Sequence, residues 1–271
     1  MHVDKSGQML YDAQEWRIRN AVAYFMGPDG LSLQPDPEEP IYRALCPHAY
    51  AGKDKQARPI YWEKTGLIRV PKLLKHLTPQ KLVKRHVRSM ELLTYRMKRN
   101  AKEVVEGYLT SECKLDKKAS TLIVDYATPD FLKQVVVMDL AGMSYAPDSK
   151  GIAVFRSCMK IDQFFYPERL GTAFIINAPW LFTGVWAVVR HFLDARTQRK
   201  FRILGSSYHK ELRKEIDEAN LLQCYGGKLE APDSFIVRDD KQKGEILRDF
   251  TESQRTTAAS SPPEAGSWGP Y

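Results

Sequence analysis

Cysteine is sparse in this chain of 271 residues, which contains four cysteines and no C-x-x-C pair. Cys46, Cys113, Cys158 and Cys224 stand too far apart along the sequence for a disulfide framework or a zinc finger. The first residues, MHVDKSGQML, also lack the basic and then apolar pattern of a secretory signal peptide. We therefore expect a soluble, cytoplasmic protein in which the cysteines are reduced, with no metal site and no cofactor.

An uninterrupted hydrophobic run is absent as well. The stretch 171–189, GTAFIINAPWLFTGVWAVV, has no charged side chain. A transmembrane helix needs about 20 mainly apolar residues, and five residues interrupt this run: Thr172, Asn177, Pro179, Thr183 and Gly184. We predict a buried strand at 172–176 and then a helix that extends to Leu193, with Asn177 as its N-cap. Because this helix is apolar on nearly every side, it is either buried or covers an apolar partner.

Acidic residues are outnumbered, because 41 lysines and arginines face 33 aspartates and glutamates, for a net charge of +8. Such a charge suits nucleic acid or an anionic membrane surface. Ten of the basic residues crowd one segment: Lys72, Lys75, Lys81, Lys84, Arg85, Arg88, Arg96, Lys98, Arg99 and Lys102. No RNA-recognition motif or zinc ligand stands near them, so we expect no nucleic-acid partner. The segment is either a solvated helix face or a surface that docks onto acidic membranes.

Helical and strand patterns alternate along the chain, which predicts an α/β domain. Helices are expected at 9–26, from Thr78-Pro79 to about 108, at 152–163 and at 211–218. Strands are expected at 58–63, 134–140, 172–176 and 201–204, the last of them buried. The inner face of the first helix is predicted to hold Leu10, Ala13, Trp16, Ala21 and Phe25. The inner face of the helix at 152–163 is predicted to hold Ile152, Phe155 and Met159.

The long helix from Thr78-Pro79 has the clearest apolar pattern outside the stretch 171–189. Its apolar positions recur every three to four residues: Val83, Val87, Met90, Leu93, Met97, Ala101, Val104 and Tyr108.

Several ordered motifs resemble one known family. They are QARPIYWE (56–63), VMDLAG (137–142), YPERLG (166–171), FIINAP (174–179), FLD (192–194), Thr197 with Lys200, ILGSSY (203–208), KEL (210–212) and YGGK (225–228). In this order and spacing they are similar to the motifs of the CRAL-TRIO lipid-binding domain family, and within it to the phosphatidylinositol and phosphatidylcholine transfer proteins. The resemblance extends over roughly residues 9–230.

The resemblance implies a CRAL-TRIO α/β fold, in which a mixed sheet floors an apolar lipid pocket beneath helices. One of these helices would be a mobile gate with Trp180, Phe182, Trp186 and Phe192. We expect a lipid-binding domain at 46–230 and a partial N-terminal helical lobe at 1–45, shortened because the family's arginine motif is missing. Residues 231–271 are polar and are expected to form an extension that is partly disordered.

The resemblance also implies a set of ligand-binding residues. The lipid headgroup would meet Asp54, Pro59, Glu168, Thr197 and Lys200. The Glu168 carboxylate would accept hydrogen bonds from inositol hydroxyls, and Lys200 would supply a positive charge for the phosphate. The pocket would be lined by Tyr61, Gln134, Val136, Asp162 and Tyr166. Three of these, Gln134, Val136 and Asp162, replace hydroxyl residues that the family uses around a choline lipid, whereas the two tyrosines remain.

We therefore expect a monomeric, non-enzymatic protein that exchanges or presents phosphatidylinositol, or phosphatidylcholine, at acidic membrane surfaces such as those of the Golgi or endosomes. Arg190, Arg196, Arg199 and Arg202 would meet anionic headgroups there. Two alternatives stay open, namely a carrier of another apolar ligand (a sterol, a tocopherol-like molecule or haem) and a membrane-recruited scaffold without cargo. A serine hydrolase is disfavoured, because Ser206 and Ser207 lack the G-x-S-x-G spacing. Without the resemblance, the gate aromatics would be read as core packing and Glu168 with Lys200 as a surface ion pair.

Overall fold

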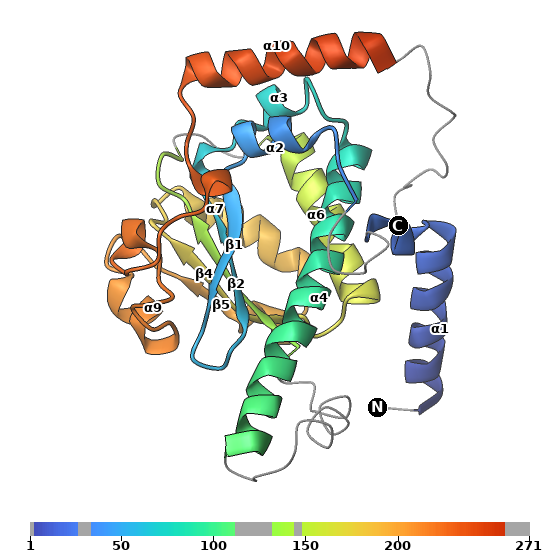
Figure 1. Cartoon of the computed structure of the whole chain (residues 1–271), viewed down its shortest axis with the longest axis vertical. Helices are drawn as coiled ribbons and strands as arrows, with labels where there is room; N and C mark the ends of the chain where they lie inside the picture. Colours follow the sequence, from blue (N-terminus) through green and yellow to red (C-terminus); the bar gives the residue numbers. More distant parts are fainter. Residues whose placement is uncertain (1–2, 27–33, 112–131, 144–147, 258–271) are drawn as a thin grey trace.

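A five-stranded mixed sheet organises the molecule (Figure 1). The computed structural model describes residues 3–26, 34–111, 132–143 and 148–257. In the sheet, β1 (His48–Lys53) pairs antiparallel with β2 (Pro59–Glu63), and β3 (Gln134–Asp139), β4 (Leu170–Ile176) and β5 (Phe201–Ile203) continue it in parallel. The strand order is β1-β2-β3-β4-β5. The predicted α/β fold with a mixed sheet is thereby confirmed, and β1 is a strand that the sequence analysis missed.

Helices lie on both faces of this sheet and across one end of it. Figure 1 shows α4 and α6 on one side, α9 on the other, and α10 across the end beside α2 and α3. Their bounds are α1 Val3–Arg19, α2 Glu39–Leu45, α3 Val70–Leu73, α4 Pro79–Ser111, α6 Ser149–Phe165, α7 Phe182–Val189, α8 Ala195–Gln198, α9 His209–Glu215 and α10 Asp240–Thr257. Short 3-10 turns are η1 Val22–Phe25, η2 Thr65–Leu67, η4 Arg190–Phe192, η5 Gln223–Tyr225 and η6 Asp233–Phe235.

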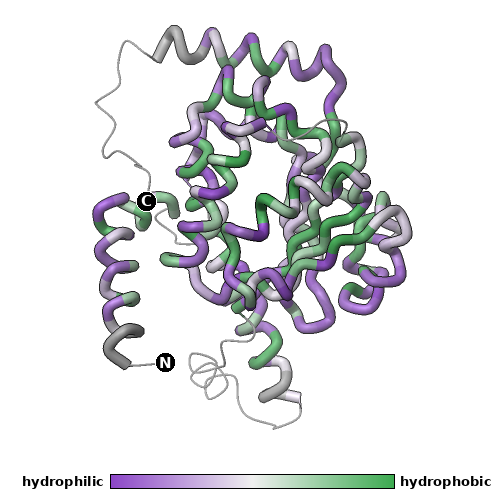
Figure 2. The backbone as a smooth tube through the Cα atoms, turned by 180° about the vertical axis from the view of Figure 1, so that it is seen from behind, coloured by the Kyte–Doolittle hydropathy of each residue, from purple (hydrophilic) through white to green (hydrophobic). Residues whose placement is uncertain are grey.

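One face of the sheet is a dry apolar core. Because side chains alternate along a strand, every second residue of β2, β3 and β4 points to this face. The set comprises Ile60, Trp62, Val135, Val137, Phe174 and Ile176, all at most 1% exposed. They pack against Leu212 of α9 and against Tyr225, whose ring stacks on Trp62 at a centroid distance of 5.3 Å. In Figure 2 green segments gather within the sheet, whereas α1 and α10 carry much purple.

The opposite face of the sheet is only partly buried. Its central row in register comprises Tyr50, Tyr61, Val136, Ala173 and Phe201. Tyr50 packs against the apolar cluster of α1, α4 and α6, and Phe201 against that of α7. All of the row except Ala173 keep some accessible surface. This face therefore differs from the dry one in being lined by tyrosines and covered less completely.

The long helix is confirmed as α4. Its positions at three- to four-residue intervals are buried: Val83, Val87, Met90, Leu93 and Met97. Ala101 and Val104 are half-buried, and the side chain of Tyr108 lies outside the described residues. The apolar stripe thus leaves the protein body toward the end of the helix.

The first helix was predicted as one element, but the structure divides it into α1 and η1. Ala21 adopts φ 50°, a left-handed conformation, and so ends the regular helix. Trp16 and Phe25 are buried as expected, whereas Leu10 is 68% exposed and Ala21 is exposed as well, so the predicted inner face is wrong at these two positions. In α6, the most buried residues are Cys158 and Ile161, and the predicted Ile152, Phe155 and Met159 are only half-buried.

The prediction of Asn177 as a helix N-cap is wrong. Asn177 has φ 52°, and its Nδ2 donates to Asp139 Oδ1 at 2.8 Å, so the side chain is bound to the end of β3. α7 begins at Phe182, with Leu181 at the N-cap position. The strand at 201–204 is also not buried, because β5 lies at the sheet edge and Arg202 and Ile203 are exposed.

The C-terminal segment contains more structure than its composition suggested. Phe235 of η6 is 1% exposed and belongs to the dry core. Ile246, Leu247 and Phe250 of α10 pack against a cluster that includes Ile41 and Leu73. Residues 258–271 lie outside the described residues, so the disorder expected there stays a prediction. The proposed domain boundaries are likewise a prediction.

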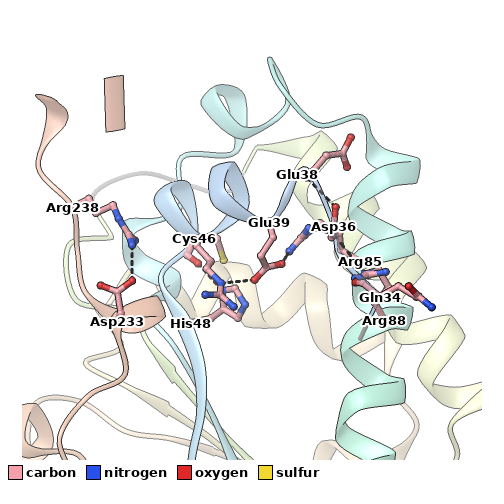
Figure 3. A network of polar contacts seen from close by, with 11 residues as sticks. Gln34, Asp36, Glu38, Glu39, Cys46, His48, Arg85, Arg88, Asp233 and Arg238 are labelled. Carbon is pink, nitrogen blue, oxygen red and sulfur yellow. Dashed lines mark hydrogen bonds and ion pairs between the residues drawn. The ribbon is translucent and has the colours of Figure 1, made fainter. Parts of the chain in front are cut away.

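Polar contacts hold the segment before α2 onto α4 (Figure 3). Arg85, which is buried, binds the carboxylates of Asp36 and Glu39. Arg88 donates to the Gln34 carbonyl at 2.6 Å. Arg85 and Arg88, which the sequence analysis counted as part of a basic surface, are therefore neutralised within the fold. Among the cysteines, Cys46 and Cys158 are buried thiols and Cys224 is exposed, while Cys113 lies outside the described residues.

Phe174 tests the dry face. Replacing this fully buried ring by alanine should lower the free energy of unfolding by about 3–5 kcal/mol, because the mutation removes apolar contacts and leaves a cavity. The matched control is Tyr24→Ala, since Tyr24 is 79% exposed and should change stability by less than about 0.5 kcal/mol. Urea denaturation measures both. Equal small effects would mean that this face is not tightly packed.

Candidate functional site

Glu168 and Lys200 meet at the edge of the sheet where the parallel strands begin. Glu168 lies in the turn before β4 with φ 59°, and Lys200 immediately precedes β5. The Lys200 Nζ lies 3.4 Å from Glu168 Oε2, and an Arg196 guanidinium nitrogen lies 3.1 Å from Glu168 Oε1. The structure thus brings together two residues that the sequence assigned to the headgroup, and adds Arg196 to them.

This ion cluster faces solvent. The Glu168 side chain is 50% exposed and that of Arg196 is 67% exposed, whereas Lys200 is only 18% exposed. Ion pairs this open to water contribute little to stability. The cluster therefore presents an acceptor flanked by two cations to any ligand that reaches the edge.

Thr197 belongs to the same segment but its hydroxyl is engaged. Thr197 Oγ1 donates to Asp194 Oδ2 at 2.6 Å, and Asp194 caps the first turn of α8. The hydrogen bonds from Thr197 hold the pKa of Asp194 below its ordinary value. The Lys200 N–H donates to the Thr197 carbonyl at 3.0 Å, which fixes the position of Lys200 relative to α8.

Asp54 and Pro59 lie at the same edge of the sheet, where β2 begins. The Asp54 carboxylate accepts hydrogen bonds from the backbone N–H groups of Gln56 and Arg58 and from Arg58 Nε at 2.6 Å. Arg58 in turn reaches Glu215 of α9 at 3.3 Å. Asp54 therefore organises the β1–β2 turn, and among the described residues it makes no hydrogen bond or ion pair with Glu168 or Lys200.

Aromatic and acidic side chains form a layer on the partly buried face of the sheet. The Tyr61 ring lies 5.0 Å from that of Tyr50 and 6.0 Å from that of His48. Tyr61 Oη donates to Glu63 Oε2 at 2.8 Å, and Thr65 Oγ1 donates to Glu63 Oε1 at 2.8 Å. We call Tyr50, Tyr61 and Glu63 the inner polar layer. The sequence analysis named only Tyr61, although the two-residue period of β2 places Glu63 on the same face.

The surroundings of this layer raise the pKa values of its two tyrosines. Burial raises the pKa of Tyr61 well above its ordinary value, and the nearby Glu63 carboxylate raises it further. Burial likewise raises the pKa of Tyr50. Both phenols therefore stay protonated and can donate hydrogen bonds at any physiological pH.

The remaining predicted pocket residues divide into two groups. Val136 adjoins Tyr61 in register, and Asp162 of α6 binds His86 of α4 at 2.6 Å. Gln134 is buried, and its Oε1 has no hydrogen-bond partner among the described residues. Tyr166, in contrast, donates to Glu91 Oε1 at 2.7 Å and packs edge-on against Trp16. Tyr166, which follows the last residue of α6, therefore connects that helix to α1 and α4.

The four gate residues have different surroundings. Phe182 is buried against Leu140 and Ile175, and the Trp186 ring lies 5.1 Å from that of Phe201. Phe192 lies beneath the Arg156 guanidinium at 5.1 Å. Trp180 is 87% exposed, so core packing does not account for it. No helix in the described ranges is long and apolar enough to cross a membrane.

An open pocket of about 490 Å³ lies beside the contact between Trp186 of the gate and Phe201 of β5. Its apolar wall comes from Trp186, Phe201 and Ile203, and two arginines, Arg190 and Arg199, stand at its margin. The arrangement offers an apolar surface and positive charge side by side. Such a combination suits an amphiphile with an anionic end.

Comparisons with known proteins agree with this geometry. A family model described as the CRAL/TRIO domain matches residues 48–227. The SEC14 cytosolic factor of Candida glabrata is 31% identical over 73% of this chain and 58% of its own length. A phosphatidylinositol/phosphatidylcholine transfer protein of Arabidopsis thaliana, SFH11, is 30% identical over 85% of this chain and 54% of its own length. The chain thus spans less than two thirds of the length of these curated relatives.

A solved structure is similar in fold. The crystal structure of Sfh5 superposes with a TM-score of 0.55 at 19% identity, covering 91% of this chain and 75% of that one. At this identity the likeness concerns the arrangement of strands and helices, not the ligand.

The pKa of His86 tests whether this side chain pairs with Asp162, one of the predicted pocket residues. Burial alone would lower its pKa, but Asp162 and Glu63 outweigh burial and raise it above the ordinary value. Because the folded pKa is raised, His86 contributes stability fully below its unfolded pKa of about 6.5 and loses it as the pH rises through the folded value. An NMR titration should show a raised pKa for His86 in the parent and a lower one in Asp162→Asn. The surface variant Glu218→Gln is the control, and an unchanged His86 in Asp162→Asn would contradict the pairing.

Proposed function

Because the chain belongs to the CRAL/TRIO domain family, we propose that it binds a phospholipid, preferably phosphatidylinositol, and exchanges or presents it at membranes without covalent chemistry. The observation that carries this proposal is the cluster of Glu168, Lys200 and Arg196 at one edge of a half-covered sheet face. The names of the relatives, which include a phosphatidylinositol/phosphatidylcholine transfer protein, support the choice of ligand.

The headgroup chemistry follows from the charges of the cluster. A carboxylate accepts hydrogen bonds from vicinal ring hydroxyls, and charge assistance makes such bonds stronger than neutral ones. The ammonium of Lys200 and the guanidinium of Arg196 lie on either side of this carboxylate and can meet a phosphate. An inositol phosphate combines both chemistries in one ligand. Asp54 would act indirectly, by holding the β1–β2 turn through Arg58.

The acyl chains require an enclosed apolar surface. Transfer of a methylene from water contributes about 0.8 kcal/mol, so a diacyl lipid with roughly 30 buried methylenes carries on the order of 20 kcal/mol of apolar burial. We propose that part of the lipid lies on the partly buried face of the sheet, where Tyr50 and Tyr61 keep some accessible surface.

The gate segment provides the proposed route to the bilayer. Trp180 and Val188 expose apolar surface at α7, and Arg190, Arg199 and Arg202 lie close by in sequence and are exposed. Tryptophan favours the membrane interface, and arginines are attracted to anionic lipids. We propose that α7 meets the membrane while the lipid passes along the pocket that Trp186 and Phe201 line.

Phosphatidylcholine is a second candidate ligand because of the inner polar layer. Tyr50 and Tyr61 present two rings 5.0 Å apart next to the Glu63 carboxylate. Aromatic rings and a carboxylate together attract a quaternary ammonium group. The residues Gln134, Val136 and Asp162 lack the hydroxyl groups that the family resemblance places there, which favours phosphatidylinositol.

A different apolar cargo, or a scaffold without cargo, is less well supported, because neither would need the charged cluster of Glu168, Lys200 and Arg196. A hydrolase is disfavoured because the His209 ring stacks on Tyr208 at 4.2 Å and makes no hydrogen bond to Ser206 or Ser207 in the described part of the chain.

We propose that the protein acts as a monomer on the cytosolic surface of Golgi or endosomal membranes. The word cytosolic in the names of several relatives supports the compartment.

Transfer of labelled phosphatidylinositol between vesicles tests the headgroup assignment. The variant Glu168→Ala with Lys200→Ala should lose about tenfold or more of the transfer rate, because it removes two charge-assisted contacts of roughly 1 kcal/mol or more each. The matched control is Glu211→Ala with Lys214→Ala, which removes another exposed Glu–Lys pair, 2.6 Å apart. Equal transfer by both variants would exclude Glu168 and Lys200 from the site.

Trp180 tests the membrane contact of the gate. Addition of acidic vesicles should shift tryptophan emission to shorter wavelength, because this 87% exposed indole enters a less polar environment. The shift should disappear in Trp180→Phe and persist in Trp186→Phe. A shift that persists in Trp180→Phe would place the membrane contact elsewhere.

A further inference from the structure

A second pocket, distant from Glu168, lies around the short helix α3. Its volume is about 710 Å³, and it is lined by Arg69, Pro71, Lys72, Lys75 and His76. Four of these five residues carry basic side chains, and none is acidic. The pocket therefore presents one sign of charge.

The positive charges of Lys72 and Lys75 are not neutralised by the part of the fold that the structure describes. The side chains of Lys72, Lys75 and His76 make no hydrogen bond or ion pair with any described residue. Basic residues just beyond them behave differently, since Lys81 binds Glu38 and Arg85 binds Asp36 and Glu39. Within the basic segment 72–102, Lys81 and Arg85 at the start of α4 are thus compensated by acids, whereas Lys72 and Lys75 at α3 are not.

The charges of Lys72 and Lys75 also act on His76. Partial burial lowers the pKa of His76, and the charges of Lys72 and Lys75 lower it further. Such mutual repulsion indicates that the groups face a common space. An anion placed there would relieve it.

The helix α3 and its first residues, which form the wall of this pocket, are fixed to the rest of the fold. Arg69 Nη1 donates to the Gly66 carbonyl at 2.9 Å. Leu73 is 5% exposed and packs with Ile41 and Leu77 in the cluster that α10 covers. The site is therefore built on a packed element, with its cations directed away from the apolar cluster.

The α3 pocket and the gate lie at the same edge of the sheet. α3 follows the carboxyl end of β2 and α7 follows the carboxyl end of β4, and both strands run parallel to β3. The helix α6 connects them, because a Cβ at Gly151 would lie 2.9 Å from Val70 of α3, and Arg156 covers Phe192 at the end of the gate segment. Glu168 and Lys200 lie at the opposite, amino edge. A ligand at α3 would therefore orient the gate without occupying the proposed headgroup site.

We propose that the α3 pocket binds the phosphate group of an anionic membrane lipid and so docks the carboxyl edge of the sheet, with the gate, onto the bilayer. A phosphate monoester suits the cations of Arg69, Lys72 and Lys75 around one space better than a phosphodiester, because it carries more charge. The bound lipid remains in the membrane and is not the transferred cargo. The occupant is thus a phosphorylated lipid headgroup.

Vesicle flotation of the full chain tests this proposal. Phosphatidylcholine vesicles contain either phosphatidic acid, which has a phosphate monoester, or phosphatidylserine at matched total charge. The variant Lys72→Ala with Lys75→Ala should lose about 30-fold of its affinity for the phosphatidic acid vesicles, because roughly 1 kcal/mol per lysine near the surface adds up to about 2 kcal/mol. It should lose less on phosphatidylserine. The matched control is Lys84→Ala with Lys98→Ala, two exposed lysines of α4 without an ion pair among the described residues, for which less than about twofold loss is expected.

Each other outcome overturns the proposal. Equal losses in the two double variants would indicate a general charge effect, and no loss would show that α3 does not contact the membrane. Inorganic phosphate at about 10 mM can also be added to the parent protein while the NMR signals of His76 are followed. If these signals shift but the variant Lys72→Ala with Lys75→Ala binds vesicles as well as the parent does, the pocket binds free phosphate only. Thermal melting of both variants controls for folding. Phosphatidylinositol transfer with Glu168→Ala and Lys200→Ala is measured separately, so failure at α3 leaves the cargo assignment untouched.

Discussion

The carboxylate of Asp139 connects the parts of this structure that have to work together. It is buried at the end of the central strand β3, where Oδ1 accepts from Asn177 Nδ2 at 2.8 Å and Oδ2 accepts from Tyr225 Oη at 2.9 Å. Burial and Asp139 raise the pKa of Tyr225, so this phenol stays a donor. Tyr225 belongs to the dry core, whereas Asn177 begins the segment that leads to α7. One buried acid thus fixes the start of the proposed gate relative to the core of the sheet.

The sheet then separates two environments. Toward α9 its side chains are apolar and fully packed, which supplies the stability of the domain. Toward α4, α6 and α7 it carries Tyr50, Tyr61 and Glu63, all of which remain partly accessible. Tyr61 donates to Glu63, and its ring lies 5.0 Å from that of Tyr50. A sheet with one packed and one incompletely covered face can hold an amphiphile without losing its own core. The charged clusters lie outside this space, with Glu168 and Lys200 at the amino edge and the α3 pocket at the carboxyl edge.

Sequence patterns predicted the elements whose periodicity is undisturbed. The α4 positions Val83, Val87 and Met90 follow the helical period, and β3 and β4 are mainly apolar runs, so their burial could be foreseen. The family motifs foresaw that Glu168 and Lys200 meet. Other features depended on tertiary contacts. Asn177 resembles an N-cap in sequence, but Asp139 holds it in a left-handed conformation instead. Nor could local pattern reveal that Arg85 is neutralised by Asp36 and Glu39 while Lys72 and Lys75 are not, because these acids lie 49 and 46 residues before Arg85 in the chain.

The central claim is that the half-covered face of the sheet holds a phospholipid. Organic extraction of the purified chain, followed by mass spectrometry, tests it most directly, with the variant Tyr61→Trp, which fills the space beside the inner polar layer, as a comparison. The account predicts close to one diacyl phospholipid per chain, enriched in phosphatidylinositol, and a reduced amount from the variant. An extract that contains a sterol, an isoprenoid or haem in place of phospholipid would contradict it, as would an empty extract from a folded protein that also fails to take up lipid from vesicles.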